Sequence, residues 1–195
     1  MRVRSKWKAK GKPRSVEDVG STLAFIAWQI GGQGVLNLEN EGFQTDDRRQ
    51  RLAVIEEFAA FVLHLTDRLC YDELEQGQRA AFIVAIARKL ADHIYNNMRE
   101  IGLEGDHRTA FIELLNARMA DYAEMPFGQG EPGFQMVRLF GDNVTRVMGE
   151  RDKKWITDQI MAIEAPLALK TLKRALNDLL LDLKAEAADE ERGEN

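Results

Sequence analysis

Histidine and carboxylate side chains lie in two neighbouring helical segments at spacings that suit metal coordination. Glu57, His64 and Asp67 follow one another at intervals of seven and three residues, and Asp92 and His93 lie in the next segment. Ligands at such spacings can meet at one point inside a helical bundle. His64, Asp67 and His93 are therefore candidate metal ligands, although the two Glu-x-x-His units of a di-metal carboxylate site are missing. No cofactor other than such a metal ion is expected.

The first of these segments carries a polar stripe, which consists of Glu57, His64, Arg68 and Tyr71. Their spacings of seven, four and three residues place them on one side of a helix, nearly opposite its most apolar side. Besides a catalytic or metal site, such a stripe can form a hydrogen-bonded network or face solvent. These alternatives stay open, because the outcome depends on how neighbouring helices cross.

Activated nucleophiles are not indicated by the sequence. Cys70 is the only cysteine and lies near the end of a helical segment, where the negative pole of the helix raises the pKa of a thiol. The serines at positions 5, 15 and 21 lie outside any Gly-x-Ser-x-Gly pattern. We therefore expect no catalytic residues of the serine or cysteine hydrolase type, and the sequence favours a non-enzymatic protein.

The cysteine count and the hydropathy pattern indicate a soluble protein of a reducing compartment. A single cysteine excludes an intrachain disulfide bond. No apolar run reaches the eighteen or so residues that are needed to span a bilayer. We expect a cytoplasmic protein without a membrane span.

The first fourteen residues form a basic arm without any acidic residue. Its seven cations recur mostly at every second position, so in an extended conformation they would project to one side: Arg2, Arg4, Lys6, Lys8, Lys10, Lys12 and Arg14. Such an arm could contact a nucleic acid or an anionic surface, or it could simply aid solubility. Without these seven cations the formal charge of −5 becomes −12, so the remainder of the chain should repel phosphate. Nucleic-acid binding is therefore expected to be weak at most.

A long segment at residues 45–71 is predicted to be the central helix of the fold. Between Leu52 and Leu65 its only charged residues are Glu56 and Glu57. A helix with no broad polar face must be covered by neighbours on several sides. We therefore predict an all-α, single-domain bundle of five to six helices at residues 15–185, followed by an acidic, disordered tail at residues 186–195.

Helical periodicity and breaker residues set the other elements. A first helix is expected to end at Gly31 and Gly32, before a loop at 31–43 with some strand character. The segment at 126–133 has two prolines and three glycines, and it is predicted to be an ordered corner. Pro166 should kink or divide the last helix. The expected helices are 16–30, 45–71, 78–101, 107–123, 134–148 and 152–184.

Five leucines in the last helix step by three and four residues and form a seam. They are Leu169, Leu172, Leu176, Leu179 and Leu183. The seam covers two heptads, fewer than a sustained coiled coil needs, so it predicts either packing within the chain or contact in a dimer. Together with the missing catalytic motifs, it favours a helical binding or assembly protein that self-associates or binds an unknown protein partner.

Overall fold

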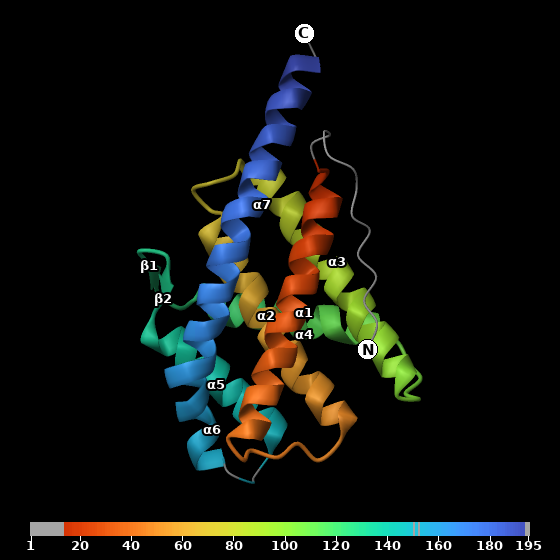
Figure 1. The fold of residues 1–195 in the computed structure, drawn as a ribbon, viewed down its shortest axis with the longest axis vertical. Helices are drawn as coiled ribbons and strands as arrows, with labels where there is room; N and C mark the ends of the chain where they lie inside the picture. Colours follow the sequence, from red (N-terminus) through yellow and green to blue (C-terminus); the bar gives the residue numbers. More distant parts are fainter. Residues whose placement is uncertain (1–13, 150, 152, 194–195) are drawn as a thin grey trace.

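The computed structural model describes residues 14–149, 151 and 153–193, and these form an all-α bundle (Figure 1). The all-α prediction is confirmed. A π-helical segment, η1 (Ile160–Glu164), joins the last two helices. None of the described helices has an apolar stretch long enough to cross a membrane. The helices are α1 (Val16–Asn40), α2 (Arg48–Leu69), α3 (Gln76–Glu100), α4 (His107–Ala123), α5 (Phe134–Met148), α6 (Lys153–Gln159) and α7 (Ala165–Gly193).

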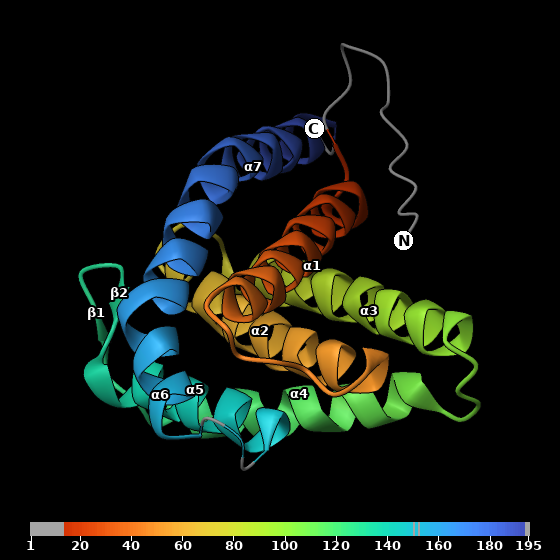
Figure 2. The same ribbon diagram turned by 60° about the horizontal axis from the view of Figure 1, so that its bottom comes forward.

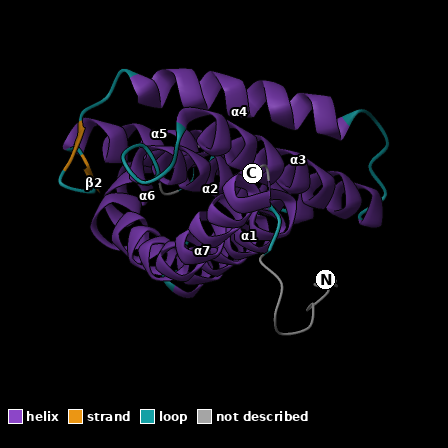
Figure 3. Ribbon diagram, turned by 90° about the horizontal axis from the view of Figure 1, so that it is seen from above, coloured by secondary structure: helices purple, strands orange, loops and turns teal. Residues whose placement is uncertain are grey.

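Helix α2 lies at the centre of the bundle, as the sequence predicts. It contacts α1, α3, α4, α5 and α7, and Val54, Phe58, Phe61 and Leu65 are at most 1% exposed (Figure 2). On the side away from α1 and α7, α4 forms an outer layer (Figure 3). The helix begins at Arg48 and not at residue 45, because the Asp47 carboxylate accepts a hydrogen bond from the Gln50 amide at 2.7 Å and caps it.

Helix α1 continues through the glycines that were expected to end it. The predictions of a helix end at residue 30 and of a partly extended loop at 31–43 are wrong. Gly31 and Gly34 face α2, where a Cβ on Gly31 would lie 3.1 Å from Ile55 Cγ2 and one on Gly34 would overlap the Phe58 ring. These glycines allow two helices to approach closely, and the stability of this contact outweighs their low helix propensity.

The chain from α6 to α7 is continuous, so Pro166 does not divide it. The Ala165 amide donates to the Ile160 carbonyl, five residues back, and this widened π-helical turn lies directly before the proline. Because proline crowds the preceding turn and lacks an amide donor, the irregularity falls where it is expected. Helix α7 then continues to Gly193, beyond the end expected near Lys184, and includes residues 186–193 of the expected disordered tail. Ala and Glu, which dominate that stretch, are strong helix formers.

The leucine seam of α7 is part of the core of the single chain. All five leucines are at most 6% exposed: Leu169, Leu172, Leu176, Leu179 and Leu183. Helix α7 runs antiparallel to α1, with Asn37 bonded to Glu164 at one end and Arg14 paired with Asp182 at the other. These leucines therefore pack within the chain and offer no exposed seam to a second copy.

The predicted corner at 126–133 contains a short hairpin, with β1 (Phe127–Gly128) paired antiparallel to β2 (Glu131–Pro132). Its two-residue turn has positive φ at Gln129 (54°) and Gly130 (73°), as a hairpin turn of this length requires. The Arg68 guanidinium stacks over the Phe127 ring at 5.6 Å and holds the hairpin against the end of α2.

The contact of α1 with α2 can be tested with two neighbouring glycines. Gly34→Ala should lower the free energy of unfolding by about 2 kcal/mol, because the Phe58 ring, which packs edge-on against Phe140, has little room to move. Gly32→Ala should raise it by about 0.5–1 kcal/mol, because nothing lies within 4 Å of a Cβ at that position and alanine favours the helix. Urea unfolding of both variants measures the difference; equal effects would contradict the close approach.

Candidate functional site

Only the first half of the polar stripe, Glu57 and His64, lies in the interior of the protein, beneath α4. Glu57 is 2% exposed and accepts two hydrogen bonds from the Arg118 guanidinium, each at 2.7 Å. This bidentate pair holds α4 on α2. Of the other stripe residues, Arg68 stacks on the hairpin, whereas Tyr71 is 64% exposed beside Arg79. The stripe is therefore divided between the interior and the surface.

His64 is a buried, neutral histidine. It is 2% exposed and its ring packs against that of Tyr122 at a centroid distance of 5.4 Å. Burial, helped by the charge of Arg68, lowers the pKa of His64 to about 4. Neither ring nitrogen has a hydrogen-bond partner among the described residues. The imidazole is thus uncharged at neutral pH.

Two further polar side chains, from α4 and α5, complete what we name the interior polar cluster: Glu57, His64, Arg118, Tyr122 and Asn143. Burial raises the pKa of the Tyr122 hydroxyl, and the nearby Asn143 side chain opposes that shift. Asn143 accepts a hydrogen bond from Arg146 at 3.0 Å. Because four of the five side chains are at most 2% exposed and Arg118 is 15% exposed, a substrate has little access to them. The arrangement fits a structural network better than a catalytic site.

The candidate metal ligands have separate neighbours. His64 packs on Tyr122, Asp67 pairs with Arg79 at 3.1 Å, and His93 packs against Trp28 at 5.8 Å between ring centroids. Within the described part of the chain, no group of three or more His, Cys, Asp or Glu side chains is arranged to hold a metal ion. The structure therefore does not bring His64, Asp67 and His93 together as a ligand set.

Two more ionisable groups belong to α2 and its C-cap: Cys70, which is buried, and Glu56, whose side chain is 13% exposed. Burial raises the pKa of the Cys70 thiol to about 12, so it stays protonated and weakly nucleophilic. Burial also raises the pKa of Glu56 to about 7, against the opposing effect of Arg49, whose guanidinium lies 3.9 Å away. The spacing of polar residues in the sequence indicates Glu57 and not Glu56 as a candidate. The sequence signal for the low exposure of Glu56 is its position inside the apolar run.

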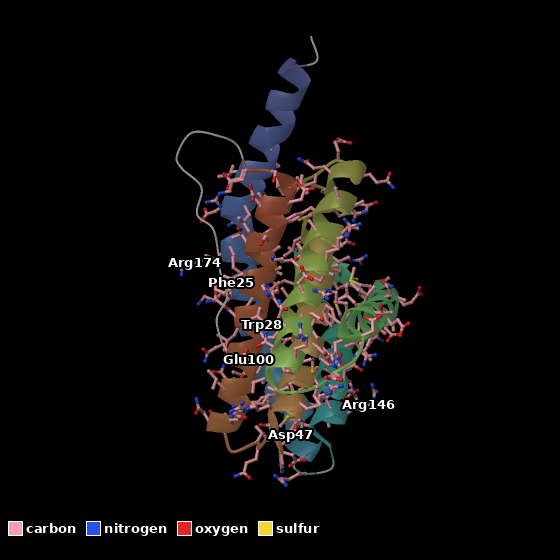
Figure 4. The ribbon with its side chains drawn as sticks, turned by 90° about the vertical axis from the view of Figure 1, so that its right-hand side faces the viewer. Phe25, Trp28, Asp47, Glu100, Arg146 and Arg174 are labelled. Atoms are coloured by element: carbon pink, nitrogen blue, oxygen red, sulfur yellow. The ribbon has the colours of Figure 1, made fainter. Side chains whose placement is uncertain are left out.

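A groove with a volume of about 830 Å³ lies between α1, α2 and α3 and is accessible from the surface. Its floor is apolar and mostly buried, and its rim is polar. Figure 4 shows Phe25, Trp28 and Glu100 along this side of the molecule, with Asp47 below them. We name it the α1–α2–α3 groove; its lining includes Phe25, Trp28, Gln29, Gly32, Val35, Leu36, Arg48, Leu52, Ile55, Asn97, Glu100 and Ile101.

The position of glycine and leucine on α1 gives the groove its shape. Gly32 points a hydrogen into it, and nothing lies within 4 Å of the place where a Cβ would be. Four residues further along the same helix, Leu36 is 51% exposed. Since a helix brings residues four apart onto one face, a hollow and an apolar ridge lie next to each other.

The rim carries charges of both signs. Arg51 is engaged by Glu39 through two hydrogen bonds of 2.6–2.7 Å. Arg48 and Glu100, from α2 and α3, are exposed, and neither has an ion pair with another described residue. Among the described residues of the rim, one cation and one anion are therefore without an ion pair and can contact whatever enters the groove.

The basic arm lies outside the described residues, except for Arg14. The Arg14 guanidinium pairs with the Asp182 carboxylate of α7 at 3.3 Å. The role of Arg2, Arg4, Lys6, Lys8, Lys10 and Lys12 therefore stays a prediction from the sequence.

No model of a known protein family, no curated protein and no solved structure matches this chain. No activity, ligand or partner of another protein is therefore transferred to it. The function has to be inferred from the α1–α2–α3 groove and the interior polar cluster.

Removing one partner of the pair formed by Glu57 and Arg118 should strongly destabilise the packing of α4. Arg118→Leu should lower the free energy of unfolding by about 3 kcal/mol, because it leaves a buried carboxylate without a partner. Adding Glu57→Leu should recover much of that loss. Arg138→Leu is the control, since Arg138 and Asp142 form an exposed pair at 3.8 Å. Urea unfolding of the wild type and these three variants measures the differences in unfolding free energy, and an equal effect of the two arginine substitutions would contradict this role.

The buried His64 should make stability depend on pH. Its pKa is about 4 in the folded state and about 6.5 when unfolded, so the unfolded chain binds more protons between these values. As pH falls through this window, wild type should lose on the order of 3 kcal/mol relative to His64→Leu. The measurement is the difference in unfolding free energy between the two proteins, in which the opposite contribution of Glu56 cancels. A difference that does not vary with pH would show that His64 is not desolvated.

Proposed function

We propose that this protein is a non-enzymatic interaction protein that binds an apolar, helical protein surface in its α1–α2–α3 groove. The observation that supports this most directly is the groove itself, in which an apolar floor lies within a polar rim. Such a combination is typical of helix-in-groove recognition. A cytoplasmic setting is part of the proposal, supported by a single cysteine that is buried and free.

An open groove suits a protein surface better than a small molecule. Small ligands are usually enclosed over most of their surface. Here Gln29, Leu36, Arg48 and Glu100 are all exposed along the rim, so the groove is accessible from the side. The polar groups that could do chemistry are instead closed off in the interior polar cluster.

The walls of the groove are held rigidly, which favours binding. The α1 wall is fixed by its close contact with α2 at Gly31 and by the hydrogen bond of Asn37 to the buried Glu164, at 2.9 Å. Arg51 links α2 back to Glu39 of α1. A surface that is already ordered loses little conformational entropy when a partner binds.

A photo-activated cross-linking amino acid at position 36 tests the proposal. In cells that make the protein, irradiation should give discrete adducts, because Leu36 lies on the groove rim and a bound partner must contact it. The matched control is the same probe at Leu181, which is 69% exposed on α7 and outside the groove. Gly32→Leu, which fills the groove, should reduce the adducts from position 36 several-fold. No adduct, or equal yields from the two positions, would contradict the proposal.

A further inference from the structure

We propose that the occupant of the α1–α2–α3 groove is the same face of a second copy of this chain. In this homodimer, Leu36 of each copy enters the groove of the other, and Arg48 of each copy faces Glu100 of the other. This inference rests on the proposed function, because it assumes that the groove is a binding surface, and it names the partner.

The first argument is that a ridge and a hollow occur side by side on one helix. A twofold interface places the same patch of both copies in contact, so the patch must be complementary to itself. Leu36, half exposed, is the ridge, and the open space at Gly32 is the hollow. Both lie on α1 one helical turn apart, so two copies in antiparallel orientation can exchange them.

The second argument is the charge on the rim. A surface made for an acidic or a basic partner would carry charges of one sign. Here the two exposed rim charges that have no ion pair among the described residues are opposite, Arg48 on α2 and Glu100 on α3. One cation and one anion are the smallest set that complements itself across a twofold axis, because each then meets its opposite.

Neither of two smaller hollows offers this combination. The hollow between α1 and α3, of about 550 Å³, has Val84 as its largest apolar side chain. The hollow before α2, of about 400 Å³, is lined by polar and charged side chains, among them the paired Glu39 and Arg51. The leucine seam of α7 is buried, so it is not the contact between copies.

The mass of the protein in solution, measured by light scattering or sedimentation, is the first test. Wild type should be a dimer at micromolar concentration, Leu36→Glu should be a monomer, and Leu181→Glu, an equally drastic change at an exposed site of α7, should remain a dimer. Both positions are exposed, so both variants should keep the wild-type circular dichroism spectrum. A monomeric wild type, or a dimer that Leu36→Glu leaves intact, would overturn the inference.

Charge reversal tests the pairing itself. Arg48→Glu and Glu100→Arg should each raise the dissociation constant of the dimer at least about tenfold, because like charges then face each other. The double variant should return it to near the wild-type value, since the pair is restored with its signs exchanged. If the effects of the two single variants on the free energy of dimerisation simply added in the double variant, the pairing would be overturned.

The failure of this inference can be distinguished from the failure of the proposed function. Adducts from position 36 that contain a different protein, together with a monomeric wild type, would overturn the dimer and leave the groove as a binding surface. Absence of both adducts and dimer would overturn the two together.

Discussion

Burial of α2 on all sides is the constraint on which the rest of this structure depends. A helix whose middle is apolar around its circumference cannot lie on a surface, so α1, α3, α4, α5 and α7 must surround it. Helix α1 can approach α2 closely because its glycines remove the side chains that would keep the two helices apart. On the opposite side, the bond between Arg118 and Glu57 allows a polar part of α2 to be covered as well. Apolar packing and one bidentate ion pair together complete the enclosure.

This enclosure separates the polar groups of the interior from the accessible surface. His64 and Tyr122 have the chemical types of catalytic residues, yet burial keeps them neutral and solvent does not reach them. The accessible surface instead offers an apolar floor and a rim of charges where α1, α2 and the end of α3 come together. This organisation supports the proposal that the groove binds another protein surface.

Much of the fold could be predicted from sequence because local signals coincide with it. Helix α4 begins at His107 and ends at Ala123 as expected, since the Asp106 side chain caps it and a proline follows it. The glycines of α1 misled the sequence analysis, because a glycine that ends a helix and one that admits a neighbouring helix look alike until the neighbour is known. For the same reason the periodicity of α2 placed Glu57 and His64 on one side but could not identify Arg118, which lies 61 residues from Glu57 along the chain. The groove could not be predicted from the sequence, because it depends on how α1, α2 and α3 are placed in space.

The π-helical turn before Pro166 also sets the rotation of the last helices about their common axis. One extra residue in a turn shifts the side chains that follow by about 100°. Ile156 before the turn, Ile160 at its start, and Leu169 and Leu172 after it all reach the core, although an uninterrupted α-helix would carry the two isoleucines and the two leucines onto different faces. The irregular turn thus rotates α7 about its axis so that its leucines face the core. Loss of a single residue from 160–164 would leave the helix straighter but turn one half of it away from the bundle.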